Sequence, residues 1–346
     1  MKKLGVRLNP LRIAVIGAGA WGTSLADFFS NIGHQTVLWI FEKDLCSRMQ
    51  KTHVNDLYLP DFKLHQNLEF TSDIIKASSS GQDVIVSAMP SHVVAQIWNN
   101  LAPTIHEEAT IVSVTKGFDP TSFLLPSQII QHSLKNLTGS DNHIVSLSGP
   151  TFALELVKRN PTAITAASSN RESALKIQEA FSTSFFRIYC SDDPIGVQVG
   201  GALKNVIALA AGIVDGLEIG LNARAALIVR GLKEISRLAS KMGGDPKTLS
   251  GLSGMGDLIL TCTGELSRNR TVGYRLGKGE KLRDILDSMV SVAEGVASAP
   301  LALSLSKKYS IDMPICEEIN AVLFDEKDPF ESLNDLMNRP FKEERA

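Results

Sequence analysis

Two kinds of hydrophobic pattern divide the chain into two parts. In the first part, short apolar runs rich in β-branched residues alternate with amphipathic stretches of helical periodicity. The predicted strands cover residues 12–17, 35–41, 83–89, 110–117, 143–149, 161–168 and 185–190. Helices are expected between several of them, as at 23–30, 93–100 and 172–182. Because strands alternate with helices, the sheet should be mostly parallel and doubly wound.

Strand signals largely vanish in the second part of the chain, which follows a polar turn at 191–194. Helical stretches are predicted at 195–213, 221–242, 281–289, 299–309 and 315–324. The predicted fold class is therefore α/β, with a mostly parallel N-terminal sheet followed by a C-terminal all-α domain. The expected domains are residues 1–192 and residues 193–346.

A glycine-rich turn joins the first predicted strand to the first predicted helix. Its sequence, Gly17-Ala-Gly19-Ala-Trp-Gly22, has the spacing of the dinucleotide fingerprint and the required strand–turn–helix context. Gly17 permits the tight turn, Gly19 lets the backbone approach a pyrophosphate, and Gly22 lets helix and strand pack closely. The free N–H groups at the helix start favour a bound phosphate. We therefore expect residues 1–192 to be a Rossmann-type domain that binds a dinucleotide.

The end of the second predicted strand bears on the choice between NAD and NADP. An acidic residue about 20 positions past the glycines favours a ribose 2′-hydroxyl, and a basic residue nearby favours a 2′-phosphate. The sequence there is Phe41-Glu42-Lys43, which contains both signs of charge. Glu42 and Lys43 are each a candidate ligand, and both are also compatible with a solvated turn. These residues leave the cofactor as NAD(P)H, with either preference open.

A single charged side chain, Lys204, interrupts the apolar helix that opens the second part. Its neighbours at three and four residues along the helix are Gly200, Gly201, Ile207 and Ala208. This face carries little side-chain bulk, so a ligand can approach the ammonium closely, and a desolvated lysine is suited to proton transfer. The alternative is that Lys204 extends from a core helix to water. The helix alone does not decide between the two.

Two polar residues of the first part follow predicted strands. Lys116 lies at the carboxyl end of a buried strand, and such ends line the ligand crevice of open α/β sheets. The alternative for Lys116 is a solvated strand terminus. Thr151 follows a strand and a Gly-Pro turn, where its hydroxyl is a candidate helix N-cap.

The second part contains two further candidate groups. Asp257 follows the flexible Gly254-Met-Gly256, where it is either a ligand or a helix cap. The run Ser267-Arg268-Asn269-Arg270 combines a candidate N-cap with an amide and two guanidinium groups. A helix start with arginine is a good phosphate site, although a solvated basic turn has the same composition.

Composition narrows the class of protein further. The 346 residues are 44% hydrophobic with a net charge of -2, which argues against a nucleic-acid binder driven by bulk basicity. The four cysteines are far apart and the histidines form no i,i+4 pair, so we expect neither a disulfide framework nor a metal site. We also expect no signal peptide and no membrane span, which predicts a cytoplasmic protein.

These motifs resemble those of the NAD(P)-dependent sn-glycerol-3-phosphate dehydrogenase family of the soluble bacterial kind, over roughly residues 12 to 335. The matching segments are 17–22, 90–92, 115–117, 148–153, 196–205, 254–258, 261–263, 267–270 and 313–319. Gly-Gly-Ala-Leu-Lys-Asn at 200–205 together with Ser-Arg-Asn at 267–269 is far more specific than the glycine fingerprint.

The resemblance implies interconversion of dihydroxyacetone phosphate and sn-glycerol 3-phosphate with NAD(P)H, a reaction that supplies phospholipid synthesis. It implies that Lys204 is the proton donor or acceptor at C2 and that the protein is a homodimer. The implied substrate contacts are Lys116, Gly149, Thr151, Lys204, Asp257, Ser267, Arg268 and Asn269. The implied cofactor contacts, which include residues of the fingerprint turn, are Gly17, Gly19, Ala20, Trp21, Gly22, Phe41, Lys116, Ala153, Arg268, Val292 and Glu294.

One departure from the family concerns Phe41, because its relatives usually carry arginine or histidine there. A phenyl ring cannot pair with a 2′-phosphate, which weakens the case for a strong NADP preference. Within the helical domain, we expect Asp257 and Asn205 to hold the Lys204 ammonium. The rival functions are a dehydrogenase of the β-hydroxyacid or 6-phosphogluconate kind and a catalytically silent NAD(P)-sensing protein.

Overall fold

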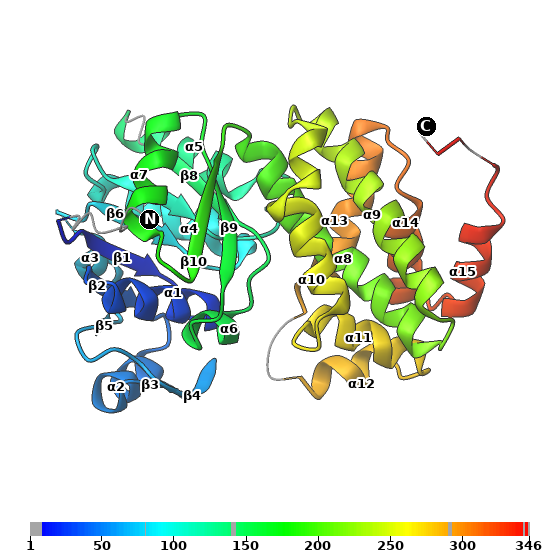
Figure 1. The fold of residues 1–346 in the computed structure, drawn as a ribbon, viewed down its shortest axis with the longest axis horizontal. Coiled ribbons are helices and arrows are strands. Elements are labelled where there is room, and N and C mark those ends of the chain that lie inside the picture. The colour runs from blue at the N-terminus through cyan, green and yellow to red at the C-terminus, as the bar shows by residue number, and fades with distance from the viewer. Residues whose placement is uncertain (1–8, 80, 140–142, 290–292, 342, 345–346) are drawn as a thin grey trace. The chain divides into compact units, whose positions relative to one another are not determined.

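The computed structural model describes residues 9–79, 81–139, 143–289, 293–341 and 343–344, and Figure 1 shows its ribbon. The chain divides into two units, Met1–Pro194 and Ile195–Ala346. Every strand among the described residues belongs to the first unit, and the described part of the second unit is helical. This confirms the predicted fold class, a Rossmann-type sheet followed by an all-α region.

The first unit is organised around one sheet. Its strands are β1 Arg12–Ile16, β2 Gln35–Trp39, β5 Glu69–Thr71, β6 Val84–Ser87, β7 Thr110–Ser113, β8 Ile144–Ser148, β9 Thr162–Ala167 and β10 Phe186–Ser191. Their order across the eight-stranded sheet is β10-β9-β8-β7-β6-β1-β2-β5. Neighbouring strands are parallel except β8 and β9. The carboxyl ends of β1, β2, β6, β7 and β8 therefore meet at one edge, where such sheets bind ligands.

Helices cover both faces of this sheet. They are α1 Ala20–Asn31, α2 Lys43–Thr52, α3 Ile74–Ser78, α4 Ser91–Leu101, α5 Pro126–Thr138, α6 Ala153–Val157 and α7 Arg171–Phe181. Side chains alternate between the two faces of a strand. Accordingly, Ile13 of β1 belongs to one hydrophobic cluster with Phe29 of α1, whereas Ile16 belongs to a second cluster with Trp98 of α4. The sheet is thus buried on both sides, as parallel sheets usually are.

Several short strands were not predicted from the hydrophobic pattern of the sequence. They include strand β5 and a separate hairpin formed by β3 Val54–Asn55 and β4 Leu59–Lys63. None of the three contains a β-branched apolar run like those by which the equally short β6 and β7 are predicted. Strand β2 also ends at Trp39, two residues before the predicted end, so that Phe41 lies beyond the sheet.

The second unit is built around a long buried helix, α8 Pro194–Gly216. The other helices are α9 Leu221–Lys241, α10 Asp257–Thr263, α11 Arg268–Gly277, α12 Leu282–Asp287, α13 Glu294–Tyr309, α14 Pro314–Phe324 and α15 Pro329–Met337. A 3-10 turn, Pro246–Ser250, and a π-helical turn, Leu252–Gly256, precede α10. The stretch predicted to be helical at 221–242 is the single helix α9.

Glycines bring α8 and α11 into backbone contact. A Cβ atom at Gly212 of α8 would lie 2.1 Å from the carbonyl oxygen of Arg270, and one at Gly273 of α11 would lie 2.0 Å from that of Leu209. Gly216 and Gly277 repeat this close approach one turn further along. No larger residue fits these positions without moving a helix. The packing fixes α11, which begins at the Ser-Arg-Asn motif, against the helix that carries Lys204.

Helix α8 bears on the expectation that the chain has no membrane span. By length and composition it qualifies as a helix able to cross a membrane. Its apolar window is, however, wholly buried inside the protein, which is the situation of a core helix in a globular unit.

Candidate functional site

The glycine turn between β1 and α1 is closed tightly against neighbouring backbone. Gly17 has φ 118° and donates its N–H to Trp39 O at 3.2 Å, which ties the turn to the end of β2. A Cβ atom at Gly17 would lie 2.5 Å from Ala88 O, and one at Gly22 would lie 2.0 Å from Gly17 O. Both positions therefore require glycine.

Gly19 differs from the other two glycines because the space beside it is open. A Cβ atom there would meet no described atom within 4 Å, and its φ of -61° is accessible to any residue. Gly19 is the N-cap of α1, a helix of 12 residues with no acidic residue in its first turn. Open space beside uncapped N–H groups at a helix start fits the pyrophosphate of a dinucleotide.

Two other predicted cofactor contacts, Ala20 and Ala153, are brought together by one side chain. The Ser24 hydroxyl donates to Ala20 O at 2.8 Å and lies 3.2 Å from Ala153 O. Trp21 is half-buried and packs against the hydrophobic cluster on that face of the sheet. Phe41, by contrast, is 73% exposed beyond the end of β2.

Lys116, Gly149 and Thr151, the three predicted substrate contacts of the first unit, converge on one carbonyl group. Lys116 Nζ donates to Gly149 O at 3.4 Å, and the Thr151 hydroxyl donates to the same oxygen at 3.2 Å. The N-cap of α6 is Phe152, so the alternative in which Thr151 caps that helix is wrong. The hydroxyl instead turns back towards the strand end it follows.

In the second unit, Lys204 is buried and paired. Its Nζ donates to Asp257 Oδ1 at 2.7 Å and to Thr261 Oγ1 at 2.8 Å. The Thr261 hydroxyl itself donates to Asp257 O at 2.6 Å. The side chains of Lys204 and Asp257 are 10% and 1% exposed. The alternative in which Lys204 extends from the helix to water is therefore wrong, because its ammonium is held by α10.

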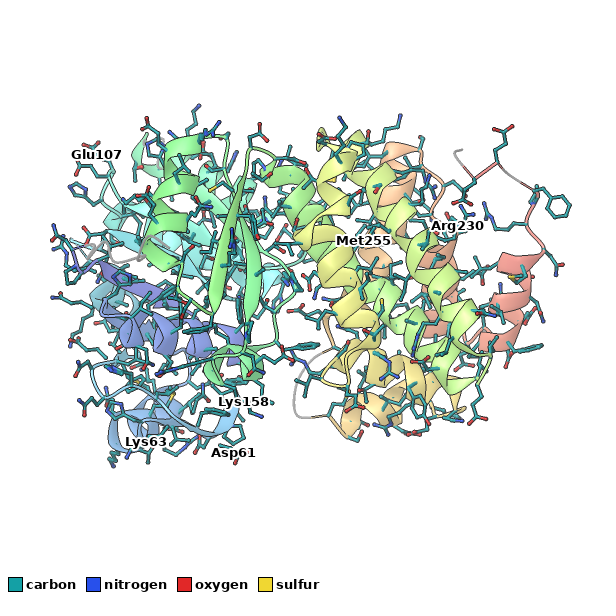
Figure 2. The ribbon with its side chains drawn as sticks, viewed as in Figure 1. Asp61, Lys63, Glu107, Lys158, Arg230 and Met255 are labelled. Carbon is teal, nitrogen blue, oxygen red and sulfur yellow. The ribbon has the colours of Figure 1, made fainter. Side chains whose placement is uncertain are left out.

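Two details of the expected lysine environment need correction. The Asn205 amide donates to Glu294 Oε2 at 3.0 Å, and Thr261 takes the place we expected for Asn205 beside the ammonium. The face of Gly200 is also filled, since a Cβ atom there would lie 2.7 Å from Ser253 O. Gly200 accommodates the π-helical turn, whose exposed Met255 is labelled in Figure 2. This glycine allows close packing and does not leave space for a ligand.

The Ser-Arg-Asn motif forms the start of α11. Ser267 is its N-cap, as the sequence suggests, and its hydroxyl accepts from Arg270 N at 3.3 Å. Asn269 is buried and accepts the N–H of Gly295 at 2.8 Å, whereas Arg268 is exposed. Asp215 fixes the other arginine of the run, Arg270, through a 2.7 Å ion pair. The motif thus presents one arginine to solvent and uses the other to hold the helix.

The amides of Asn205 and Asn269 also fix the start of α13, through Glu294 and Gly295 respectively. This connects α8 and α11 with the segment that the resemblance assigns to the cofactor. Val292, another predicted cofactor contact, lies outside the described residues.

Two residues that contact the Lys204 cluster or the glycine turn, Thr261 and Asn55, are not among the site residues predicted from the sequence. Thr261 follows Asp257 by four residues on α10, so a helical i,i+4 spacing was available as a signal. Asn55 of the short hairpin donates to Ala18 O of the glycine turn at 2.9 Å and to Thr23 Oγ1 of α1 at 2.8 Å. A single asparagine 32 residues from Thr23 gives no sequence signal for that contact.

A Rossmann sheet with an open glycine turn, followed by a helical unit with a buried lysine–carboxylate pair, defines a dinucleotide-dependent oxidoreductase of two units. The family models for the N-terminus and C-terminus of NAD-dependent glycerol-3-phosphate dehydrogenase match residues 12–174 and 193–334. The chain belongs to this NAD-dependent glycerol-3-phosphate dehydrogenase family.

The chain is similar to individual members of the family over almost their whole length. The chain is 47% identical over 334 residues to the glycerol-3-phosphate dehydrogenase [NAD(P)+] of Syntrophotalea carbinolica, covering 96% of this chain and 99% of that protein. It is 46% identical to the enzyme of the same name from a Geobacter species, covering 96% and 98%. The crystal structure of glycerol-3-phosphate dehydrogenase from Coxiella burnetii matches with a TM-score of 0.90 at 35% identity, covering 95% of this chain and 99% of that one.

Proposed function

We propose that this protein reduces dihydroxyacetone phosphate to sn-glycerol 3-phosphate with NAD(P)H, and catalyses the reverse oxidation, with Lys204 as proton donor and acceptor. The observation that carries the proposal is the buried contact between Lys204 and Asp257 at 2.7 Å. Family membership supports the choice of substrate.

The proton-transfer role follows from how the lysine is held. When bound, the nicotinamide supplies the hydride chemistry at C2. Negative charge then grows on the C2 oxygen, and a cation that donates a hydrogen bond and afterwards a proton stabilises it. An ammonium has three N–H donors, of which Asp257 and Thr261 engage two. Within the described part of the chain, no other acceptor takes the third N–H, which is proposed to donate to the substrate oxygen, and the Asp257 carboxylate orients the ammonium.

Binding of the phosphate is assigned to the start of α11. The exposed Arg268 guanidinium and the first N–H groups of the helix would hold it, with Ser267 and Asn269 beside them. Anchoring the phosphate fixes the position of C2 relative to the catalytic groups, which lowers the entropic cost of reaction. In the first unit, Lys116, Gly149 and Thr151 are proposed as further substrate contacts, supported by their convergence on the Gly149 carbonyl group.

The cofactor contacts are proposed on the turn and on the segments that follow neighbouring strands. They are Gly17, Gly19, Ala20, Trp21, Gly22, Phe41, Lys116 and Ala153 in the first unit, with Arg268, Val292 and Glu294 in the second. The cellular role proposed is the supply of glycerol 3-phosphate for phospholipid synthesis by a cytoplasmic homodimer. Sedimentation velocity tests the dimer.

The function is tested with a panel of substrates, by following oxidation of NADH and NADPH with ketone substrates and reduction of NAD+ and NADP+ with hydroxy substrates. Dihydroxyacetone phosphate should support turnover, and unphosphorylated dihydroxyacetone should do so far more weakly, because α11 would have no phosphate to bind. Oxidation of a β-hydroxyacid or of 6-phosphogluconate in preference to glycerol 3-phosphate would favour the rival dehydrogenase. Absence of turnover with every substrate, by protein that binds NADH, would favour the sensing role.

A further inference from the structure

Asn55 connects the glycine turn to the β3–β4 hairpin. Its side chain is fully buried, and its amide nitrogen donates to Ala18 O at 2.9 Å and to Thr23 Oγ1 at 2.8 Å. Its amide oxygen accepts from Tyr58 N at 3.0 Å. Both ends of the amide are therefore used, which fixes the position of Tyr58 relative to the glycine turn.

Tyr58 in turn holds Glu42. The phenol donates to Glu42 Oε1 at 2.8 Å. Burial, followed by the hydrogen bond to Glu42 and the charge of that carboxylate, raises the pKa of Tyr58, so the phenol remains a donor at neutral pH. The outer residues of the same hairpin, Asp61 and Lys63, are exposed (Figure 2), so only its inner side takes part in this connection.

The Glu42 carboxylate is half-buried, and one of its two oxygens accepts a hydrogen bond from Tyr58. Glu42 is the N-cap residue of α2 in an extended conformation, but its side chain does not cap that helix. Among the residues that the structure describes, none donates a hydrogen bond to its second oxygen, Oε2. The carboxylate is thus oriented by Tyr58 and retains an oxygen that can accept from a ligand.

Glu42 also lies at the correct edge of the sheet for a ribose. Strands β1 and β2 are parallel, with Ile16 opposite Trp39, and the first glycine of the turn bonds to Trp39 O. Glu42 comes three residues after Trp39, about 20 residues past the last glycine of the turn, where an acidic side chain accepts from the ribose 2′-hydroxyl. A 2′-phosphate would instead place up to about two negative charges beside a carboxylate that the Tyr58 phenol holds in place.

We propose that Glu42 makes this protein prefer NAD(H) over NADP(H), and that Asn55 and Tyr58 are positioning residues that connect its carboxylate to the glycine turn. The exposed Phe41 beside it carries no charge to offset that of a 2′-phosphate. This inference rests on the proposed function and adds the cofactor preference to it.

The test compares the dissociation constants of NADH and NADPH, measured from nicotinamide fluorescence on the full chain without substrate. Wild-type protein should bind NADH at least about tenfold more tightly than NADPH, a difference of about 1.4 kcal/mol. Glu42→Gln keeps an acceptor for Tyr58 but removes the charge, and should bring the two constants to within about threefold. Tyr58→Phe should narrow the ratio less, and Tyr189→Phe, a matched change on exposed β10, should leave it unchanged.

Several results would overturn the proposal. One is equal or tighter binding of NADPH by the wild type, particularly if Lys43→Ala then weakens NADPH alone, since Lys43 would be the group that binds the 2′-phosphate. Another is an unchanged ratio in Glu42→Gln. Equal weakening of both cofactors in Tyr58→Phe, with an unchanged thermal midpoint, would remove the positioning role. Because binding needs no turnover, failure to reduce dihydroxyacetone phosphate would contradict the proposed function alone.

Discussion

The glycine turn of the first unit and the Lys204 cluster of the second unit are built on opposite physical principles. At Gly17 and Gly22 the turn depends on missing side chains, because a Cβ atom there would lie 2.5 Å or less from a backbone oxygen. The cluster depends on side chains that satisfy one another, since Lys204 and Asp257 are both almost fully buried. The first site is vulnerable to added atoms and the second to lost charge.

This contrast also determines what each site can do. Open backbone N–H groups recognise a phosphate without any titratable side chain, so the turn suits binding. The role that we propose for the cluster is proton transfer, since its ammonium is buried and held by a carboxylate. The variants below perturb one principle at a time.

The largest effect on stability is expected from removing one charge of the buried pair. Asp257→Asn leaves the Lys204 ammonium without its counter-charge and should lower the free energy of unfolding by about 3–5 kcal/mol. Lys204→Met combined with Asp257→Leu should recover most of that loss, because no buried charge remains. Urea unfolding followed by circular dichroism measures both, with exposed Asp284→Asn as control. A loss below about 1 kcal/mol would mean that the pair is solvated like a surface salt bridge.

In the glycine turn, two alanine substitutions should have opposite signatures. Gly22→Ala places a Cβ atom 2.0 Å from Gly17 O and should lower the free energy of unfolding by about 3 kcal/mol. Gly19→Ala meets no described atom within 4 Å, so stability should change by less than about 0.5 kcal/mol. The affinity for NADH should nevertheless fall at least about tenfold in Gly19→Ala, because the methyl group occupies the pyrophosphate's approach. Unchanged binding in that variant would contradict the cofactor position.

Glu234 offers a smaller, pH-dependent test, because it is a buried carboxyl group that, unlike Asp257, forms no close ion pair with a described residue. It is 1% exposed and accepts from Ile315 N at 2.8 Å and Cys316 N at 3.2 Å at the start of α14. Burial raises the pKa of Glu234 from 4.5 to about 7 despite these hydrogen bonds. The stabilisation from its protonated form is therefore complete below pH 4.5 and is lost as the pH rises through about 7.

Wild-type protein should accordingly lose about 2 kcal/mol of stability between pH 5 and pH 8 relative to Glu234→Gln, which cannot ionise. Urea unfolding at the two pH values measures the difference, and Glu265→Gln at an exposed site is the control. If wild type and Glu234→Gln showed the same pH dependence, the carboxyl group would already be ionised at pH 5 and stabilised by the helix start.

Local patterns made the fold and the glycine turn predictable from the sequence. The strands of the central sheet have β-branched apolar runs, and the fingerprint lies within six consecutive residues, so both can be recognised without knowing any long-range contact. Lys204 could be singled out because it is the only charged residue in the apolar stretch 195–213. Of its two partners, Asp257 was expected and is confirmed, whereas Thr261, 57 residues away along the chain, was not predicted.

The incorrect expectations share that physical origin. Gly200 has the appearance of an open face on an isolated helix, but tertiary packing places Ser253 against it. Asn205 is adjacent to Lys204 in sequence, yet consecutive side chains on a helix point in different directions, and its amide reaches Glu294. Asn55 and Tyr58 belong to a hairpin whose strands lack a β-branched apolar run. The sequence does not reveal which distant segments of the chain come into contact.

The most direct test of the central claim is the turnover number of Lys204→Ala with saturating dihydroxyacetone phosphate and NADH. Loss of the proton donor should reduce it by about 10²–10⁴-fold, while Lys241→Ala at an exposed position retains wild-type turnover. Added ethylamine should partly restore activity to Lys204→Ala, which also shows that the variant is folded. Wild-type turnover in Lys204→Ala without added amine would contradict the assignment of Lys204 as the proton donor.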